Sequence, residues 1–279
     1  MTYFTDIEDI RGMPAAEYFA RPEISRSELV SLLDCPARFP WSRAHPIDPT
    51  AAMVLGTRVH ELVLEGIEPL DGAIIVKASW CLTAKGEPAK SPKATKTWKT
   101  AAETAEASGV DIYLDTEAKP IIEEVRLIAA EVNKHLGHIV DGCETEVAVF
   151  ATHAETGVRV KARLDALADN YVADLKTTKA ADAESFARSI GNYRYDIQAA
   201  FYGDLAGSLA GTEHLPFVFA CVETSEPHLT AVWDLDEDWI ENGRADYERA
   251  LSLYKKYEAE GYPATLGKGT LSPKPWQIG

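Results

Sequence analysis

The sequence lacks the closely spaced cysteines that build metal sites or disulfide frameworks. Its four cysteines, Cys35, Cys81, Cys143 and Cys221, are far apart in the chain. Zinc ribbons and four-cysteine iron–sulfur sites need paired cysteines separated by a few residues, so the sequence argues against both. Dispersed thiols in a chain of 279 residues are typical of a reduced, intracellular protein.

The sequence also lacks long apolar runs and an excess of positive charge. No apolar stretch approaches the ~18 residues of a membrane span. The first residues, MTYFTDIEDIRGM, have no basic or apolar segment of a signal peptide, so we expect a cytoplasmic protein without a membrane partner. The net charge of −16 disfavours nucleic-acid binding unless basic residues cluster locally.

Enough apolar residues are present for one substantial core. They make up 46% of the chain, which predicts a single domain over residues 1–279 with an N-terminal helical part, 1–70. The first ordered element is expected to be a helix that Ser25 and Glu28 cap and that ends before Pro36. Further helices are predicted over 51–65, 117–136, 181–190, 195–210 and 236–261, and strands over 144–150, 157–168, 171–178, 216–223 and 229–235. This order predicts a mixed α/β fold with helices packed on a central sheet, followed by an irregular tail.

One segment reverses the charge balance. Residues 77–99 hold six lysines against one acid, Glu87, a local charge of +5, together with Trp80 and Trp98. The segment is predicted to be a long basic loop. It is either a solvated, mobile loop or the local basic patch that nucleic-acid binding requires.

A predicted hairpin brings two acids together. A two-residue turn at 169–170 places Asp165 opposite Asp174 and Arg163 opposite Lys176. Opposed Cβ atoms lie about 4.5–5.5 Å apart, so the two carboxylates repel each other unless a cation lies between them. Hard divalent cations take paired carboxylate oxygens, so this face is a candidate metal site. The alternative is a polar face that simply points to solvent.

The preceding strand offers a further acid. If residues 153–156 form a four-residue loop, Glu144 lies opposite Asp165 and Glu146 lies opposite Arg163. A loop of odd length turns both glutamates to the other face of the sheet.

Five short stretches follow one another along the chain, namely GTRVH, EVAVF, TGVRVKARLD, DLKTT and YDIQAAFY. They resemble the motifs of a known nuclease family and occur in the same order as in that family. Over residues 24–235 the chain resembles the PD-(D/E)XK nuclease superfamily, its RecB-like branch, and within it the phage exonuclease VIII type (RecE nuclease domain). The resemblance implies a restriction-endonuclease-like core with a mixed central β-sheet flanked by helices. LLDCPARF is similar to the Cys-Pro signature of RecB-like nucleases. Some of those hold an iron–sulfur cluster, but the further cysteines near the C-terminus are missing here, so no cluster is expected.

The resemblance also implies residue roles. The implied metal ligands are His60, Asp165, Asp174, the carbonyl of Leu175, and Glu146 with Glu144 as its rival. Lys176 activates the attacking water, and Gln198 braces the site. The implied DNA contacts are Tyr195, Tyr202, Lys90, Lys93, Lys96 and Arg163. An ordinary structural histidine at position 60 and packing roles for both tyrosines are the alternatives.

The implied activity is that of a Mg²⁺-dependent DNA exonuclease in which Mn²⁺ substitutes for Mg²⁺. Such an enzyme degrades linear duplex DNA from its ends, 5′ to 3′, and leaves 3′ single-stranded tails for recombination. A homo-oligomer, with a ring around DNA, and a single-strand annealing protein as partner are implied too, in the host cytoplasm if a phage encodes the chain. The alternatives are a RecB-like nuclease acting on single strands or flaps, and a non-catalytic DNA-binding or scaffolding protein on a nuclease fold.

Overall fold

A mixed sheet forms the centre of the molecule. The computed structural model describes residues 2–265, so most of the tail that was expected to be irregular lies outside the described residues. The strands follow the order β1-β5-β6-β7-β8-β9, and β2 pairs with β6. They are β1 (Phe4–Ile10), β2 (Ile24–Ser25), β5 (Glu144–His153), β6 (Arg159–Leu167), β7 (Val172–Thr178), β8 (Phe217–Glu223) and β9 (Thr230–Asp234). Neighbours are antiparallel except the parallel pairs β7–β8 and β2–β6.

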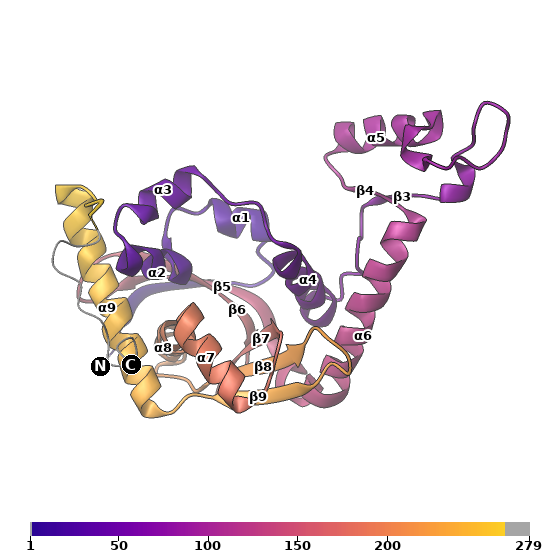
Figure 1. Cartoon of the computed structure of the whole chain (residues 1–279). Coiled ribbons are helices and arrows are strands. Elements are labelled where there is room, and N and C mark those ends of the chain that lie inside the picture. The colour runs from indigo at the N-terminus through magenta and orange to yellow at the C-terminus, as the bar shows by residue number, and fades with distance from the viewer. Residues whose placement is uncertain (1, 266–279) are drawn as a thin grey trace, which may run out of the picture.

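Helices cover both faces of this sheet (Figure 1). They are α1 (Ala15–Ala20), α2 (Arg26–Asp34), α3 (Arg38–Ala44), α4 (Ala51–His60), α5 (Lys96–Ser108), α6 (Asp115–Val140), α7 (Ala183–Tyr193), α8 (Tyr195–Ala210) and α9 (Glu237–Glu260). Helices α2, α8 and α9 pack in the largest apolar cluster on one face, and α4 and α6 pack on the other. The expected fold class, a mixed sheet flanked by helices, is confirmed.

Several elements of the N-terminal half were not predicted, among them β1, α3 and α5. Strand β1 precedes the helix at Ser25, so the expectation that this helix comes first is wrong. Its sequence FTDIEDI is hard to recognise because Phe4 alone is buried and the acids lie on exposed positions of an edge strand. Helix α3 contains Pro40 in its first turn, where the missing N–H has no partner within a helix anyway. Helix α5 begins at Lys96, so the expected basic loop ends earlier than Lys99.

Residues 74–114 fold into a small lobe, which we call the arm. Strand β3 (Ile74–Val76) runs parallel to β4 (Ile112–Leu114), and α5 packs on both. The arm has its own apolar core around Val76, Cys81 and Leu114. Figure 1 shows it standing away from the sheet at the N-terminal end of α6. The basic segment is therefore part of a folded lobe. The single-domain expectation stays a prediction.

No helix within residues 2–265 is long and apolar enough to cross a bilayer. All four cysteines are free thiols.

Asp204 joins α8 to α9 in the interior. The Arg244 guanidinium donates to both carboxylate oxygens of Asp204 at 2.7 Å, and the Tyr247 hydroxyl and His214 Nδ1 lie 2.7 Å from them. Burial by itself raises the pKa of Asp204, but the hydrogen bonds from Arg244, His214 and Tyr247 outweigh it and hold the pKa below its usual range. Most of α8 is buried, so the charge of Asp204 has to be compensated by partners of this kind.

We predict that Asp204→Asn destabilises the protein by about 3 kcal/mol at neutral pH, because it leaves the Arg244 cation without its counter-charge. The depressed pKa means that the stabilisation by ionised Asp204 is present above its unfolded value of about 3.9 and is lost as the pH falls through the folded value. Denaturant unfolding between neutral and acid pH measures both effects.

Asp34→Asn is the matched control, since Asp34 pairs with Arg38 on the surface. It should change the unfolding free energy by less than about 0.5 kcal/mol. Equal losses in the two variants contradict the buried-pair explanation.

Candidate active site

The β6–β7 hairpin has the predicted register but a short ladder. Its turn lies at 169–170, and Ala166 pairs with Ala173 and Leu167 with Val172, as expected. Pairing with β6 stops there, whereas on its other edge β7 pairs with β8 over its whole length. Asp165 Oδ2 instead accepts a hydrogen bond from the Leu175 amide at 2.9 Å. The two strands therefore separate where Asp165 and the acid of β7 lie.

The β5–β6 register differs from the expected one by two residues. The four-residue loop is 154–157 instead of 153–156, closed by the Gly157 amide on the His153 carbonyl at 2.8 Å. Glu144 therefore pairs with Leu167 and Arg163 with Ala148, so the expected partners of both glutamates are wrong. The even loop length, which determines the face, was correct.

Glu146 and Asp165 lie opposite each other at an interruption of the β5–β6 ladder. The residues on both sides of them pair, but these two do not, and Glu146 has a left-handed φ of +53°. On β6, Leu164 packs in the largest cluster whereas Ala166 packs against the face that α6 covers. The alternation of faces thus breaks at Asp165. Such irregularities re-aim side chains, and here they direct two acids to one place.

His60 completes a cluster with these two acids. One potential ligand atom from each of His60, Glu146 and Asp165 lies within 4.8 Å of the other two. His60 Nδ1 is 3.4 Å from Asp165 Oδ2. His60 is the last residue of α4, and Gly56 lets this helix approach β7: a Cβ there would lie 2.9 Å from Thr177 Oγ1.

Glu146, and not Glu144, lies in this cluster. The side chain of Glu146 is 13% exposed and ion-paired with Arg163 Nε, whose guanidinium also donates to the Met13 carbonyl. Glu144 is 52% exposed and pairs with Arg11. Arg163 is only 13% exposed and is occupied in orienting Glu146, so its expected DNA contact stays a prediction.

Asp174 stands next to the cluster, held from two sides. Its Oδ1 accepts from Gln198 Nε2 of α8 at 2.5 Å, and its Oδ2 is 2.6 Å from Lys176 Nζ. The ammonium of Lys176 lies 4.9 Å from the ring centroid of Tyr195. Burial lowers the pKa of Lys176, but Asp174, Tyr195 and Asp165 together raise it more, so the pKa lies above its usual value and Lys176 stays charged.

The electrostatics of the cluster favour a cation. Burial and the Asp174 carboxylate raise the pKa of Asp165 well above its usual range. Burial lowers the pKa of His60, which favours the neutral imidazole that ligates metals. Asp174 Oδ2 is buried and faces the Lys176 ammonium at 2.6 Å. Carboxylate oxygens with one imidazole fit a divalent cation such as Mg²⁺ or Mn²⁺.

Arg26 is a neighbour of the site that the sequence reasoning missed. Its guanidinium donates to the carbonyls of Tyr193 and Arg194 and lies 5.7 Å from the Tyr195 ring centroid. Its Nε is buried without a hydrogen-bond partner, and among the described residues no acid forms an ion pair with it. The sequence does contain an indication of this role. Arg26 is the first residue of α2, and a cation is unfavourable at that end of a helix because of the helix dipole.

The other residues that were expected to contact DNA lie in different parts of the structure. Tyr202 is half-buried against Phe201 and Phe217, and burial raises its pKa to about 12. Lys90, Lys93 and Lys96 are exposed on the arm, away from the acids. Their roles, and that of Tyr195 beside Lys176, stay predictions.

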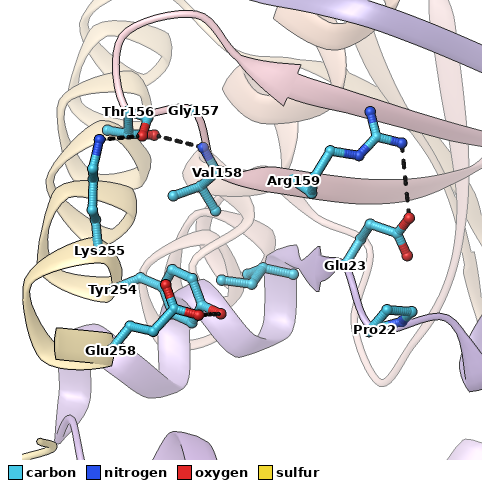
Figure 2. Close-up of a pocket in the computed structure, with 10 residues that line it drawn as sticks. Pro22, Glu23, Thr156, Gly157, Val158, Arg159, Tyr254, Lys255 and Glu258 are labelled. Carbon is cyan, nitrogen blue, oxygen red and sulfur yellow. Dashed lines mark hydrogen bonds and ion pairs between the residues drawn. The ribbon is translucent and has the colours of Figure 1, made fainter.

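A surface cavity lies elsewhere. Figure 2 shows a cavity of about 570 Å³ between the β5–β6 loop and α9. Its charged groups are engaged within the protein: Arg159 lies 3.8 Å from Glu23, and Lys255 donates to the Thr156 carbonyl at 2.7 Å. None of the clustered residues lines this cavity.

Comparisons with known proteins agree with this arrangement. A family model described as PDDEXK-like domain of unknown function (DUF3799) matches residues 25–268. The structure is similar to the crystal structure of a predicted exonuclease from Eubacterium rectale, with a TM-score of 0.57 and 13% identity over 89% of this chain and 88% of the other. That likeness shows a shared fold. No curated protein matches the sequence.

The two glutamates of β5 provide a paired test of the cluster. We predict that Glu146→Gln weakens Mn²⁺ binding at least about tenfold, because it removes a carboxylate beside His60 and Asp165. Glu144→Gln changes the same charge at the surface and should leave the affinity unaltered. Calorimetric titration with Mn²⁺ measures both, and equal losses contradict the assignment of Glu146.

Proposed function

Because the chain belongs to the PDDEXK-like family DUF3799, we propose that it is a metal-dependent nuclease that hydrolyses DNA phosphodiester bonds. The observation that carries this proposal is the convergence of His60, Glu146 and Asp165 beside an Asp174–Lys176 pair. Buried acids gathered beside a retained lysine favour an active enzyme over a non-catalytic DNA-binding or scaffolding protein.

The metal ligands in this proposal are His60, Glu146 and Asp165, joined by Asp174 and the Leu175 carbonyl. A bound Mg²⁺, or Mn²⁺ in its place, polarises the scissile phosphate and lowers the pKa of a coordinated water. Gln198 fixes Oδ1 of Asp174 through the 2.5 Å hydrogen bond, and the Lys176 ammonium faces Oδ2 at 2.6 Å, so both carboxylate oxygens are oriented.

In this proposal two cationic side chains, Lys176 and Arg26, interact with the scissile phosphate. Lys176 holds its charged ammonium next to the acids, where it orients the attacking water and stabilises the negative charge that develops on the phosphate. Among the residues that the structure describes, Arg26 Nε is buried without a hydrogen-bond partner and no acid forms an ion pair with Arg26, so an anion satisfies it. Tyr195 lies beside both cations and fixes their side chains.

More narrowly, we propose an exonuclease of the exonuclease VIII type that degrades linear duplex DNA 5′ to 3′ and leaves 3′ single-stranded tails. The resemblance supports this reading, and on the same ground we propose a ring-shaped homo-oligomer and an annealing protein as partner. A ring suits a chain of net charge −16, because encirclement retains DNA while only the arm is strongly basic. A RecB-like nuclease acting on single strands or flaps is the competing activity.

The decisive experiment incubates 5′- and 3′-labelled linear duplex and single-stranded DNA with the protein, with and without Mg²⁺. We expect Mg²⁺-dependent loss of label from duplex ends. Asp174→Asn, which keeps the side-chain shape, should lower the rate at least about a hundredfold because it removes the charge next to Lys176.

Glu144→Gln is the active control, and circular dichroism verifies that Asp174→Asn is folded. Full activity of folded Asp174→Asn contradicts the site. Preferential digestion of single strands or flaps supports the competing activity instead.

The arm lysines are expected to contact DNA phosphates. Replacing Lys90, Lys93 and Lys96 by Glu should weaken DNA binding by at least roughly tenfold at low salt and shorten the tracts digested per encounter. The control replaces Lys119 and Lys134, two exposed lysines of α6, by Glu. Undiminished degradation of long duplexes by the arm variant rejects this role.

A further inference from the structure

The arm exposes a large aromatic surface as well as charge. Trp80 is 60% exposed and Leu82, two residues later, is 45% exposed. Lys77 Nζ lies 5.0 Å from the ring centroid of Trp80. An indole and a leucine left in water have no role in the arm's own core, which is built around Val76 and Cys81.

Trp80 ends a short 3₁₀ helix (Ala78–Trp80) that Lys77 precedes, and Leu82 lies in the hairpin that follows it. The Ala89 amide donates to the Cys81 carbonyl at 2.9 Å, and the Thr83 amide donates to the Glu87 carbonyl at 2.8 Å. Cys81 is fully buried at the base of the hairpin, and Lys85 lies in its turn. The exposed side chains are thus presented on an ordered scaffold, which lowers the entropic cost of binding through them.

Most of the arm's positive charge is not neutralised within the protein. Among the described residues, Lys93 alone of the six lysines in 77–99 forms an ion pair, with Glu117 at 2.7 Å. Lys77 and Lys85 are exposed on the same segment as the indole. The surface therefore offers unpaired cations beside an aromatic face, which complements a ligand that has both phosphates and unstacked rings.

We propose that the arm binds single-stranded DNA, with Trp80 stacking on an unpaired base and Lys77 and Lys85 contacting the flanking phosphates. Lysines alone are enough for a duplex, whose bases are hidden in the stack, whereas an exposed indole adds affinity only for bases that are unpaired. The proposal rests on the proposed nuclease function, since the strand bound is the one that digestion leaves unpaired.

The test compares the full-length protein with Trp80→Ala by fluorescence anisotropy in EDTA, which suppresses digestion. The probes are a labelled oligothymidylate of about 20 nucleotides and a dumbbell duplex closed by loops at both ends. Trp80→Ala should weaken oligothymidylate binding roughly tenfold and dumbbell binding less than about twofold. Trp80→Phe, which keeps a stacking ring, should restore most of the affinity.

A second tryptophan serves as the matched control. Trp41 of α3 is 58% exposed and lies outside the arm, so Trp41→Ala removes a similar indole without touching the proposed surface. It should bind both probes like the wild type. Unchanged oligothymidylate binding by Trp80→Ala, or equal losses in the two alanine variants, overturns the proposal.

The salt dependence of DNA affinity distinguishes the contribution of base stacking from that of phosphate contacts. Lys85→Gln should reduce the slope of log affinity against log salt by roughly 0.7, the value for one phosphate contact on a single strand, and Trp80→Ala should leave it unchanged. A membrane surface is the alternative ligand. If Trp80→Ala loses binding to phosphatidylserine–phosphatidylcholine vesicles but keeps oligothymidylate binding, the single-strand assignment is wrong.

The outcomes distinguish this inference from the nuclease itself. If the wild type binds oligothymidylate through Trp80 but digests no DNA with Mg²⁺, the binding assignment stands and the proposed function fails. If it digests DNA and Trp80→Ala binds oligothymidylate like the wild type, the proposed function stands and this inference fails.

Discussion

Repulsion between buried carboxylates is the constraint on which the rest of the site depends. Glu146, Asp165 and Asp174 are gathered within a small volume of low dielectric, and each needs a compensating group. Arg163 pairs with Glu146 and Lys176 pairs with Asp174, whereas burial and the Asp174 carboxylate raise the pKa of Asp165. Both cationic partners come from the sheet itself, Arg163 from β6 and Lys176 from β7, and α8 adds the Gln198 amide that holds Asp174. The fold therefore gathers negative charge but leaves part of it uncompensated, as a cation site requires.

The sequence predicted the parts of the site that local rules determine. The turn at 169–170 sets the β6–β7 register through its length, and helical spacing places Gln198 and Tyr202 on one face of α8. The capping residues of α2 were likewise readable, because Ser25 and Glu28 satisfy each other's backbone groups. Periodicity and turn length act over a few residues, so they are visible in the chain itself.

The remainder depends on non-local contacts. No sequence pattern shows that β6 and β7 separate after two pairs, or that Glu146 adopts a left-handed backbone, because both follow from packing of distant segments. The loop after β5 was displaced by one residue because several four-residue windows there are compatible with a turn. Strand β1 and the arm were missed for a related reason: their apolar faces are short, and they become stable only against partners elsewhere in the chain.

Helix α6 connects the arm to β7, the strand that carries Asp174 and Lys176. It begins directly after the arm's last strand, and further along it packs Val125, Ile128 and Val132 in the same cluster as Leu175, which stands between Asp174 and Lys176 on β7. A helix of 26 residues, about 39 Å long, acts as a stiff rod. One continuous helix therefore spans the distance from the arm to the strand that carries Asp174 and Lys176, so the position of the arm relative to these residues is set by a single rigid element.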